Sequence, residues 1–130
     1  MNRHVEIFDG TRWTPVCRTS DLIPGRGVAV LGPGGEQIAV FRDRPGTLYA
    51  VGNRDPFSGA HVMSRGILGS RGDVPTVASP MYKQVFDLRD GRCLDESTAP
   101  DGTPAALRTW PVRDTAETTS QPAAAGVHGP

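Results

Sequence analysis

The sequence predicts an all-β protein made of antiparallel strands, and three observations indicate this fold class. Short β-branched and aromatic runs alternate with turn clusters between Thr14 and Val51. The 16 glycines and 12 prolines together make 28 of 130 residues, well above the usual combined share of about 12%, and so favour many turns. The connections are too short for parallel crossovers. We therefore expect one domain, an antiparallel β-sandwich.

The expected strands follow one another along the chain. In the first half they occupy residues 14–17, 27–31, 37–41 and 47–51. The segment "TSDLIPG" between the first two is expected to hold one helical turn, capped by Ser20. In the second half we expect strands at residues 76–79, 84–88 and 92–94 and a last one within 106–114, where Pro111 marks an edge or a bulge.

The region from Gly52 to Pro80 is less periodic and contains two long glycine-bearing loops, at residues 57–66 and 69–75. Loops of this kind often carry function when a rigid sheet positions them. We place a short N-terminal segment at residues 1–12, the domain at 13–114 and a disordered tail at 115–130, where large apolar residues are almost absent.

Composition and charge exclude several classes of function. The 14 basic and 14 acidic residues cancel and form no run of one sign, which argues against a nucleic-acid or anionic-membrane partner. The sequence contains no apolar run of the roughly 18 residues that span a membrane, and "MNRHVEIFDG" lacks a secretory signal, so we expect a cytoplasmic protein. Cys17 and Cys93 are then expected to be ordinary buried thiols.

Two stretches have the spacing of a metal-cluster site. "NRDPF" at 53–57 and "SPMYKQVFDLRDG" at 79–91 resemble the two loops of Rieske-type domains, small β-sandwiches that hold a [2Fe-2S] cluster through two Cys and two His ligands. By this resemblance the four ligand positions fall on Asp55, Phe57, Ser79 and Tyr82. None of them is a cysteine or a histidine.

This departure from the Rieske pattern predicts that the chain holds no cluster and no other metal. Phenylalanine has no donor atom, and serine and neutral tyrosine are poor ligands for iron-sulfur iron. We expect packing and hydrogen bonds to replace the cluster. Phe57 and Tyr82 would fill the space, while Asp55 and Ser79 would bond backbone N–H groups of the facing loop.

A narrower resemblance covers about residues 13–114 and is densest at "NRDPFSGAHVMSRGILG" and "SPMYKQVFDLRDGRCLD". It is to the small subunits of assimilatory NAD(P)H-dependent nitrite reductases, the NirD-like group. The resemblance implies a large catalytic subunit as partner, carrying FAD, a [4Fe-4S] cluster and sirohaem and reducing nitrite to ammonium. The chain itself would be a non-catalytic subunit of this oxidoreductase, with no cofactor and no activity alone.

The two loops also carry residue types that are enriched at protein interfaces. The expected partner-binding residues are Arg54, Phe57, His61, Met63, Arg65, Lys83 and Gln84. Two alternative functions remain: an electron-transfer protein with unusual cluster ligands, and a free-standing interaction module of another oxidoreductase.

Overall fold

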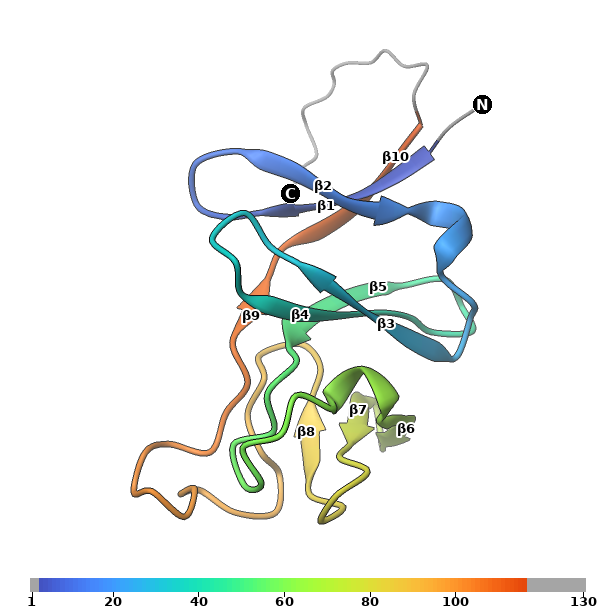
Figure 1. Cartoon of the computed structure of the whole chain (residues 1–130). Coiled ribbons are helices and arrows are strands. Elements are labelled where there is room, and N and C mark those ends of the chain that lie inside the picture. The colour runs from blue at the N-terminus through green and yellow to red at the C-terminus, as the bar shows by residue number, and fades with distance from the viewer. Residues whose placement is uncertain (1–2, 117–130) are drawn as a thin grey trace.

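The computed structural model describes residues 3–116, which form ten strands and two single-turn 3-10 helices (Figure 1). The fold class is therefore all-β and antiparallel, as predicted. The 3-10 helices, η1 (Thr19–Asp21) and η2 (Met63–Arg65), have three residues each. In this part of the chain no helix is long and apolar enough to cross a membrane.

The strands pair into three antiparallel sheets. One sheet has the order β10-β1-β2, the central sheet has the order β3-β4-β5-β9, and a small sheet has the order β6-β7-β8. Their bounds are β1 (Arg3–Phe8), β2 (Trp13–Arg18), β3 (Arg26–Leu31), β4 (Gln37–Arg42), β5 (Leu48–Gly52), β6 (Ile67–Arg71), β7 (Val74–Ala78), β8 (Val85–Asp87), β9 (Thr109–Trp110) and β10 (Val112–Ala116).

The central sheet is buried on both faces, and the sequence of β4 shows why. Successive side chains of a strand point to opposite faces, so the continuous apolar run 38–41 supplies two cores at once. Ile38 and Val40 join a first core with Val5 and Ile7 of β1. Ala39 and Phe41 join a second core that contains Phe86 of β8. Full burial of each large apolar side chain contributes about 1.5–3 kcal/mol.

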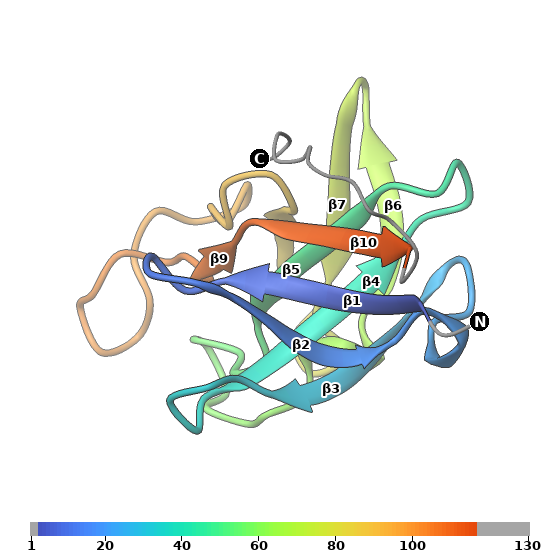
Figure 2. The same cartoon turned by 90° about the horizontal axis from the view of Figure 1, so that it is seen from above.

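The two cores divide the molecule into two halves, which Figures 1 and 2 show from two directions. The sandwich half comprises residues 3–52 and 109–116, with the β10-β1-β2 sheet packed on the central sheet around the first core. The loop half comprises residues 53–108, with the β6-β7-β8 sheet and the loops packed around the second core. The two loops of the Rieske resemblance both lie in the loop half.

Residues outside both ends of the predicted domain, 13–114, also take part in the sandwich. Within the segment 1–12, residues 3–8 form β1, where Val5 and Ile7 are fully buried. Strand β1 pairs with β2 on one side and β10 on the other. Of the tail predicted at 115–130, Thr115 and Ala116 belong to β10, and residues 117–130 lie outside the described part.

Some local predictions were wrong. Residues 92–94 form no strand and make only single bridges, Phe86 with Cys93 and Arg92 with Ala106. The strand predicted within 106–114 is broken at Pro111 into β9 and β10, which belong to different sheets. Ser20 lies inside η1 instead of capping it, and Asp21 closes this turn by accepting a hydrogen bond from the Arg18 N–H at 2.9 Å.

Strand β6 was missed because "GSRGDVP" has the composition of a loop. It forms a hairpin with β7, in which Arg71 pairs with Val74 across a two-residue turn. Gly72 in this turn has a φ of 60°, a left-handed conformation that suits glycine. The pattern of alternating burial in β6 is weak, since four of its five residues are exposed.

Candidate functional site

The first loop leaves β5 at Asn53, which anchors it to the sheet. The side chain of Asn53 is almost fully buried. Its Nδ2 donates to the Gln37 Oε1 at 3.2 Å, and its Oδ1 accepts from the Ser64 N–H at 2.7 Å. Its backbone N–H donates to the Gln37 carbonyl at 3.0 Å. Asn53 thus fixes the loop against β4 and η2, a role that sequence reasoning did not assign.

Asp55 organises the first loop from inside, where its side chain is fully buried. Its Oδ1 accepts from the Phe57 N–H at 2.8 Å. Its backbone N–H donates to the Ala60 carbonyl at 2.8 Å, and its carbonyl accepts from the Gly59 N–H at 2.7 Å. These bonds close residues 55–60 into a tight turn.

Ser79 plays the same part in the second loop, between β7 and β8. Its Oγ accepts from the Met81 N–H at 3.2 Å, and its carbonyl accepts from the Lys83 N–H at 3.1 Å. Its own N–H donates to the Gln84 carbonyl at 2.9 Å. Lys83 has a φ of 67°, the one positive φ of a non-glycine residue within residues 3–116. The second loop is therefore a closed turn with local backbone strain.

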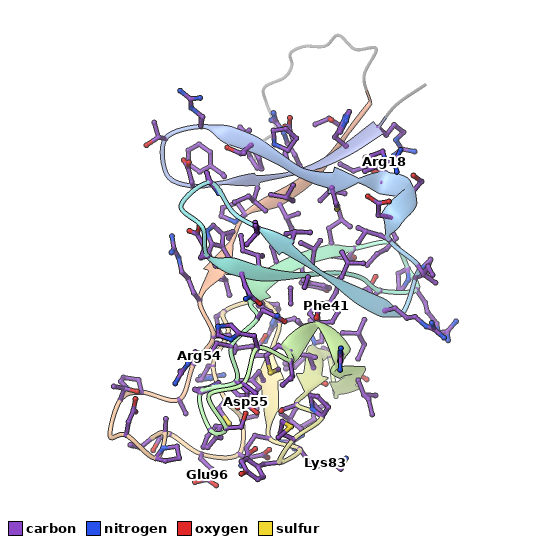
Figure 3. All side chains as sticks on the ribbon, in the orientation of Figure 1. Arg18, Phe41, Arg54, Asp55, Lys83 and Glu96 are labelled. Atoms are coloured by element: carbon purple, nitrogen blue, oxygen red, sulfur yellow. The ribbon has the colours of Figure 1, made fainter. Side chains whose placement is uncertain are left out.

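The two loops are joined at Asp55 and Ser79, which by the Rieske resemblance stand at the positions of the two cysteine ligands. The Ser79 Oγ donates a buried hydrogen bond of 2.5 Å to the Asp55 Oδ2. We predicted bonds from these side chains to N–H groups of the facing loop. Instead, each side chain accepts an N–H of its own loop and the two side chains bond each other. Figure 3 places Asp55 deep between the segments of the loop half.

The two aromatic residues at the former ligand positions behave differently from each other. The ring of Phe57 packs 6.2 Å from the ring of Phe86 at a tilt of 55°, and Phe57 is half-buried against the second core. Tyr82 is 59% exposed, and its hydroxyl makes no hydrogen bond within residues 3–116. The expectation that Tyr82 fills the space is therefore wrong.

Phe57 and Tyr82 share an open hollow of about 440 Å³ at the end of the loop half. Its other lining residues are Gln84, Glu96, Thr98, Ala99 and Pro100. The Oε1 atom of Gln84 is buried there without a hydrogen-bond partner in the described residues. Residues 96–100 come from a segment that sequence reasoning left unassigned, because nothing in its composition links it to the two motifs.

The residues present do not fit a [2Fe-2S] cluster. Within residues 3–116 no group of three or more His, Cys, Asp and Glu side chains lies close enough to hold a metal ion. The one carboxylate at a ligand position, Asp55, already accepts two hydrogen bonds. Cys17 lies on β2 in the other half, where burial raises the pKa of its thiol to about 11, and Cys93 is buried in the second core.

The structure separates the predicted partner-binding residues. Arg54, His61 and Lys83 are exposed, and Arg54 and His61 pair across the first loop. Phe57 and Gln84 line the hollow described above. Met63 is fully buried in the second core, so its assignment to a partner surface was wrong. Arg65 lines a different hollow, beside β3 and β6.

Asp87 is a further anchor that sequence reasoning did not single out, although it belongs to the "FD" of the second motif. It is fully buried, and Arg89 donates to both of its oxygens from Nε at 3.1 Å and Nη2 at 2.9 Å. The Arg89 N–H adds a bond of 2.8 Å. The hydrogen bond from the Arg89 side chain holds the pKa of Asp87 below its usual value.

Known proteins are similar to this chain in sequence and fold. Residues 12–120 match the Rieske-like [2Fe-2S] domain family. The nitrite reductase (NADH) small subunit of Salmonella typhimurium is 41% identical over 87 residues, which are 66% of this chain and 80% of that protein. A crystal structure described as an NADH-dependent nitrite reductase small subunit from Mycobacterium tuberculosis has 51% identity and a TM-score of 0.69, covering 78% of this chain and 85% of that one.

A third relative is of a different kind. The nitrite reductase [NAD(P)H] large subunit of Klebsiella oxytoca is 43% identical over 101 residues, which are 78% of this chain but only 10% of that protein. A domain similar to this chain is therefore part of a much longer polypeptide there. From the fold, the two motifs and these matches, the chain belongs to the Rieske-like [2Fe-2S] domain family and, within it, to the nitrite reductase small subunits.

Proposed function

We propose that the chain is the small, non-catalytic subunit of an assimilatory NAD(P)H-dependent nitrite reductase. The large subunit is its partner and carries FAD, a [4Fe-4S] cluster and sirohaem, on which nitrite is reduced to ammonium. The small subunit acts in the cytoplasm, holds no cofactor and is inactive alone. Its contribution is made through assembly.

The observation that carries this proposal is the extent of the match to small subunits, four-fifths of the Salmonella protein. The Klebsiella protein supports the partner: there, a similar domain and a large subunit share one polypeptide, which keeps the two at high effective concentration. An electron-transfer role of the chain itself is less well supported, because Asp55 and Ser79 bond each other where such a role needs cluster ligands.

The end of the loop half is the proposed surface for this assembly. The exposed groups of the loop half include an aromatic ring, Tyr82, and the cations Arg54 and Lys83. Figure 3 shows Lys83 at the end of this half and Arg54 on its side. Such groups suit an interface, because aromatic residues and arginine are enriched where two proteins meet. Of the residues predicted from sequence, the proposal keeps Arg54, Phe57, His61, Lys83 and Gln84.

The test is an assay of NAD(P)H-dependent nitrite reduction by the purified large subunit, with and without an equimolar amount of this chain. We expect the chain alone to be inactive and its addition to raise the rate or the thermal stability of the large subunit. The charge-reversal variant Lys83→Glu should weaken this effect, whereas Arg12→Glu, in the turn between β1 and β2, should not. An unchanged rate and melting temperature on adding wild-type chain would contradict the proposal.

The cofactor part of the proposal needs a separate measurement. The chain, purified under anaerobic conditions with iron and sulfide supplied, should show neither the visible absorption nor the EPR signal of a reduced [2Fe-2S] centre. A stoichiometric signal would favour the electron-transfer function instead.

A further inference from the structure

A second open hollow lies away from the former cluster site. It has a volume of about 1000 Å³ and lies beside β6, between the start of β3, the turn that joins β4 to β5, and η2. We call it the β6 groove. Its lining residues are Gly25, Arg26, Gly27, Asp43, Arg44, Pro45, Tyr49, Asp73, Pro75 and residues 64–70.

The groove runs along a free strand edge. Strand β6 is the outer strand of the small sheet and pairs only with β7, on whose outer side Figure 2 shows it. Ile67 and Gly69 point to one face of the sheet and Leu68 and Ser70 to the other, yet all four line the groove. The groove is therefore lined by the outer edge of β6 and not by one face of the sheet.

The free edge offers backbone hydrogen bonds. Arg71 and Val74 flank a two-residue hairpin turn and therefore form a hydrogen-bonded pair. Because such pairs alternate along an antiparallel ladder, Arg71, Gly69 and Ile67 exchange backbone hydrogen bonds with their partners in β7. The N–H and C=O groups of Leu68 and Ser70 then point away from β7. Unpaired edges of this kind accept a strand from another chain.

The walls of the groove suit an extended chain. Gly25 and Gly69 line it, and the space that a Cβ would take at these two positions holds no backbone atom of a neighbouring segment, so the backbone there is accessible. Ile67, at the start of β6, lines the groove and is 67% exposed. An apolar side chain of a docked strand would cover it.

The groove is lined by three arginines and two aspartates, Asp43 and Asp73, so its lining has a net positive charge. Arg26, Arg44 and Arg65 line it and form no ion pair within the described residues. Asp43, by contrast, is engaged by its own turn, since its Oδ1 accepts from the Gly46 N–H at 2.9 Å and the Thr47 N–H at 2.7 Å. Three arginines without partners favour carboxylates on the occupant.

We propose that the β6 groove docks an extended, acidic segment of the large subunit, which pairs with Leu68 and Ser70 as a fourth strand of the β6-β7-β8 sheet. Carboxylates of this segment bind Arg26, Arg44 and Arg65, and an apolar side chain covers Ile67. A second copy of the chain fits less well, because β6 carries no acidic residue, and the one beside it, Asp73, lies in the hairpin turn that already lines the groove. This inference rests on the proposed function, since it names a second contact with the same partner.

The sharpest test of strand pairing is Ser70→Pro. Proline removes the outward N–H of residue 70 and costs no bond to β7, because position 70 lies opposite Pro75 in a non-bonded pair. We expect the dissociation constant of the full chain for purified large subunit to rise about tenfold or more. Ser70→Ala, which keeps the N–H, is the matched control and should stay within about twofold.

The charge contribution is tested in the same titration with Arg44→Glu and Arg65→Glu. Each should weaken binding about tenfold at low salt, and less at high salt because the ions screen the pairs. Arg12→Glu, a reversal of the same size in the turn between β1 and β2, is the matched control. Hydrogen exchange should show the Leu68 and Ser70 amides exchanging fast in the free chain and slowly in the complex.

The outcomes separate the two proposals. If wild-type chain does not bind the large subunit at all, the proposed function fails. If it binds, while Ser70→Pro, Arg44→Glu and Arg65→Glu all bind equally well and the two amides stay unprotected, the groove proposal alone is overturned. It is also overturned if the free chain dimerises with Leu68 and Ser70 protected, since the occupant is then a second copy.

Discussion

The two halves of the molecule are stabilised in different ways. In the sandwich half, strands of mostly five or six residues pair over long registers around an apolar core. In the loop half the strands have three to five residues, and the four isolated bridges of residues 3–116 lie there. All five buried polar residues within residues 3–116 also lie in the loop half: Asn53, Asp55, Thr76, Ser79 and Asp87.

This difference explains how the two loops can keep one conformation although their residues do not fit a metal cluster. An apolar core tolerates changes of shape at a graded cost, because its contacts have no direction. A buried polar side chain demands particular partners, and leaving one unpaired costs about 1–3 kcal/mol. Asn53, Asp55 and Ser79 each bind backbone N–H groups of the loops and so specify one loop conformation.

The largest effect is expected at Gly91, in the turn after β8. It has a φ of 82°, and an added Cβ would overlap the carbonyl oxygen of Leu107. Gly91→Ala should therefore lower the free energy of unfolding by about 4 kcal/mol or more, measured by urea denaturation. Gly102→Ala is the matched control: its φ is 87° but the space is open, so only the conformational cost of about 1–2 kcal/mol applies. Equal losses for both would contradict the steric account.

A smaller loss is expected when the bond that joins the two loops is removed. Ser79→Ala leaves the Asp55 Oδ2 buried without a donor and should cost about 2 kcal/mol. The double variant with Asp55→Ala should lose less than the sum of the single variants, because the two side chains act as a pair. Thermal or urea unfolding of all three variants measures this coupling.

The control for this pair is Ser58→Ala in the same loop. Ser58 is only half-buried, and its Oγ accepts one bond, from the Ala60 N–H at 3.2 Å. Its loss should cost less than about 1 kcal/mol. Additive losses at Asp55 and Ser79 would show that the bond does not join the two loops in solution.

The two halves also differ in how much of their structure the sequence predicts. The apolar runs 27–31 and 37–41 lie within the observed strands β3 and β4, and the run 47–51 matches β5 except at its first residue, because burial on a sheet leaves a direct pattern in composition. The positions Asp55 and Ser79 were found through spacing, yet their bond to each other was not, because a hydrogen bond between residues 24 apart leaves no periodic trace. Tyr82 and Met63 were misjudged because residue type alone does not set exposure.

Acid should weaken the part of the loop half around β8. Hydrogen bonds lower the pKa of Asp87, first from the Arg89 side chain, and of Asp95, first from the Val85 N–H. The pKa of such a carboxyl is lower in the folded state than in the unfolded chain, where it is about 3.9. The group therefore stabilises the folded protein at pH values above about 3.9, and this stabilisation is lost as the pH falls through the folded pKa. The protection factors of the backbone amides, which correct for the intrinsic pH dependence of hydrogen exchange, should then fall first near β8 as the pH drops below about 4.

Asp87→Asn checks the assignment of this acid sensitivity. The variant should be less stable than wild type at pH 7, because Arg89 loses its charged partner, and its stability should depend less on pH between about 4 and 2. Asp21→Asn, at an exposed position in the sandwich half, serves as control and should keep the wild-type slope. An unchanged slope in Asp87→Asn would assign the acid sensitivity to other carboxyls.

The smallest effect is expected at Lys83, and it has the opposite sign. Its φ of 67° costs about 1–2 kcal/mol for a residue with a Cβ, and glycine avoids this cost at the expense of about 0.5–1 kcal/mol of chain entropy. Lys83→Gly should therefore raise the free energy of unfolding by up to about 1 kcal/mol. Met81→Gly in the same loop, where φ is not positive, should lower it. If Lys83→Gly stabilises the free chain and also weakens its binding to the large subunit, the strained lysine is retained for the partner and not for the fold.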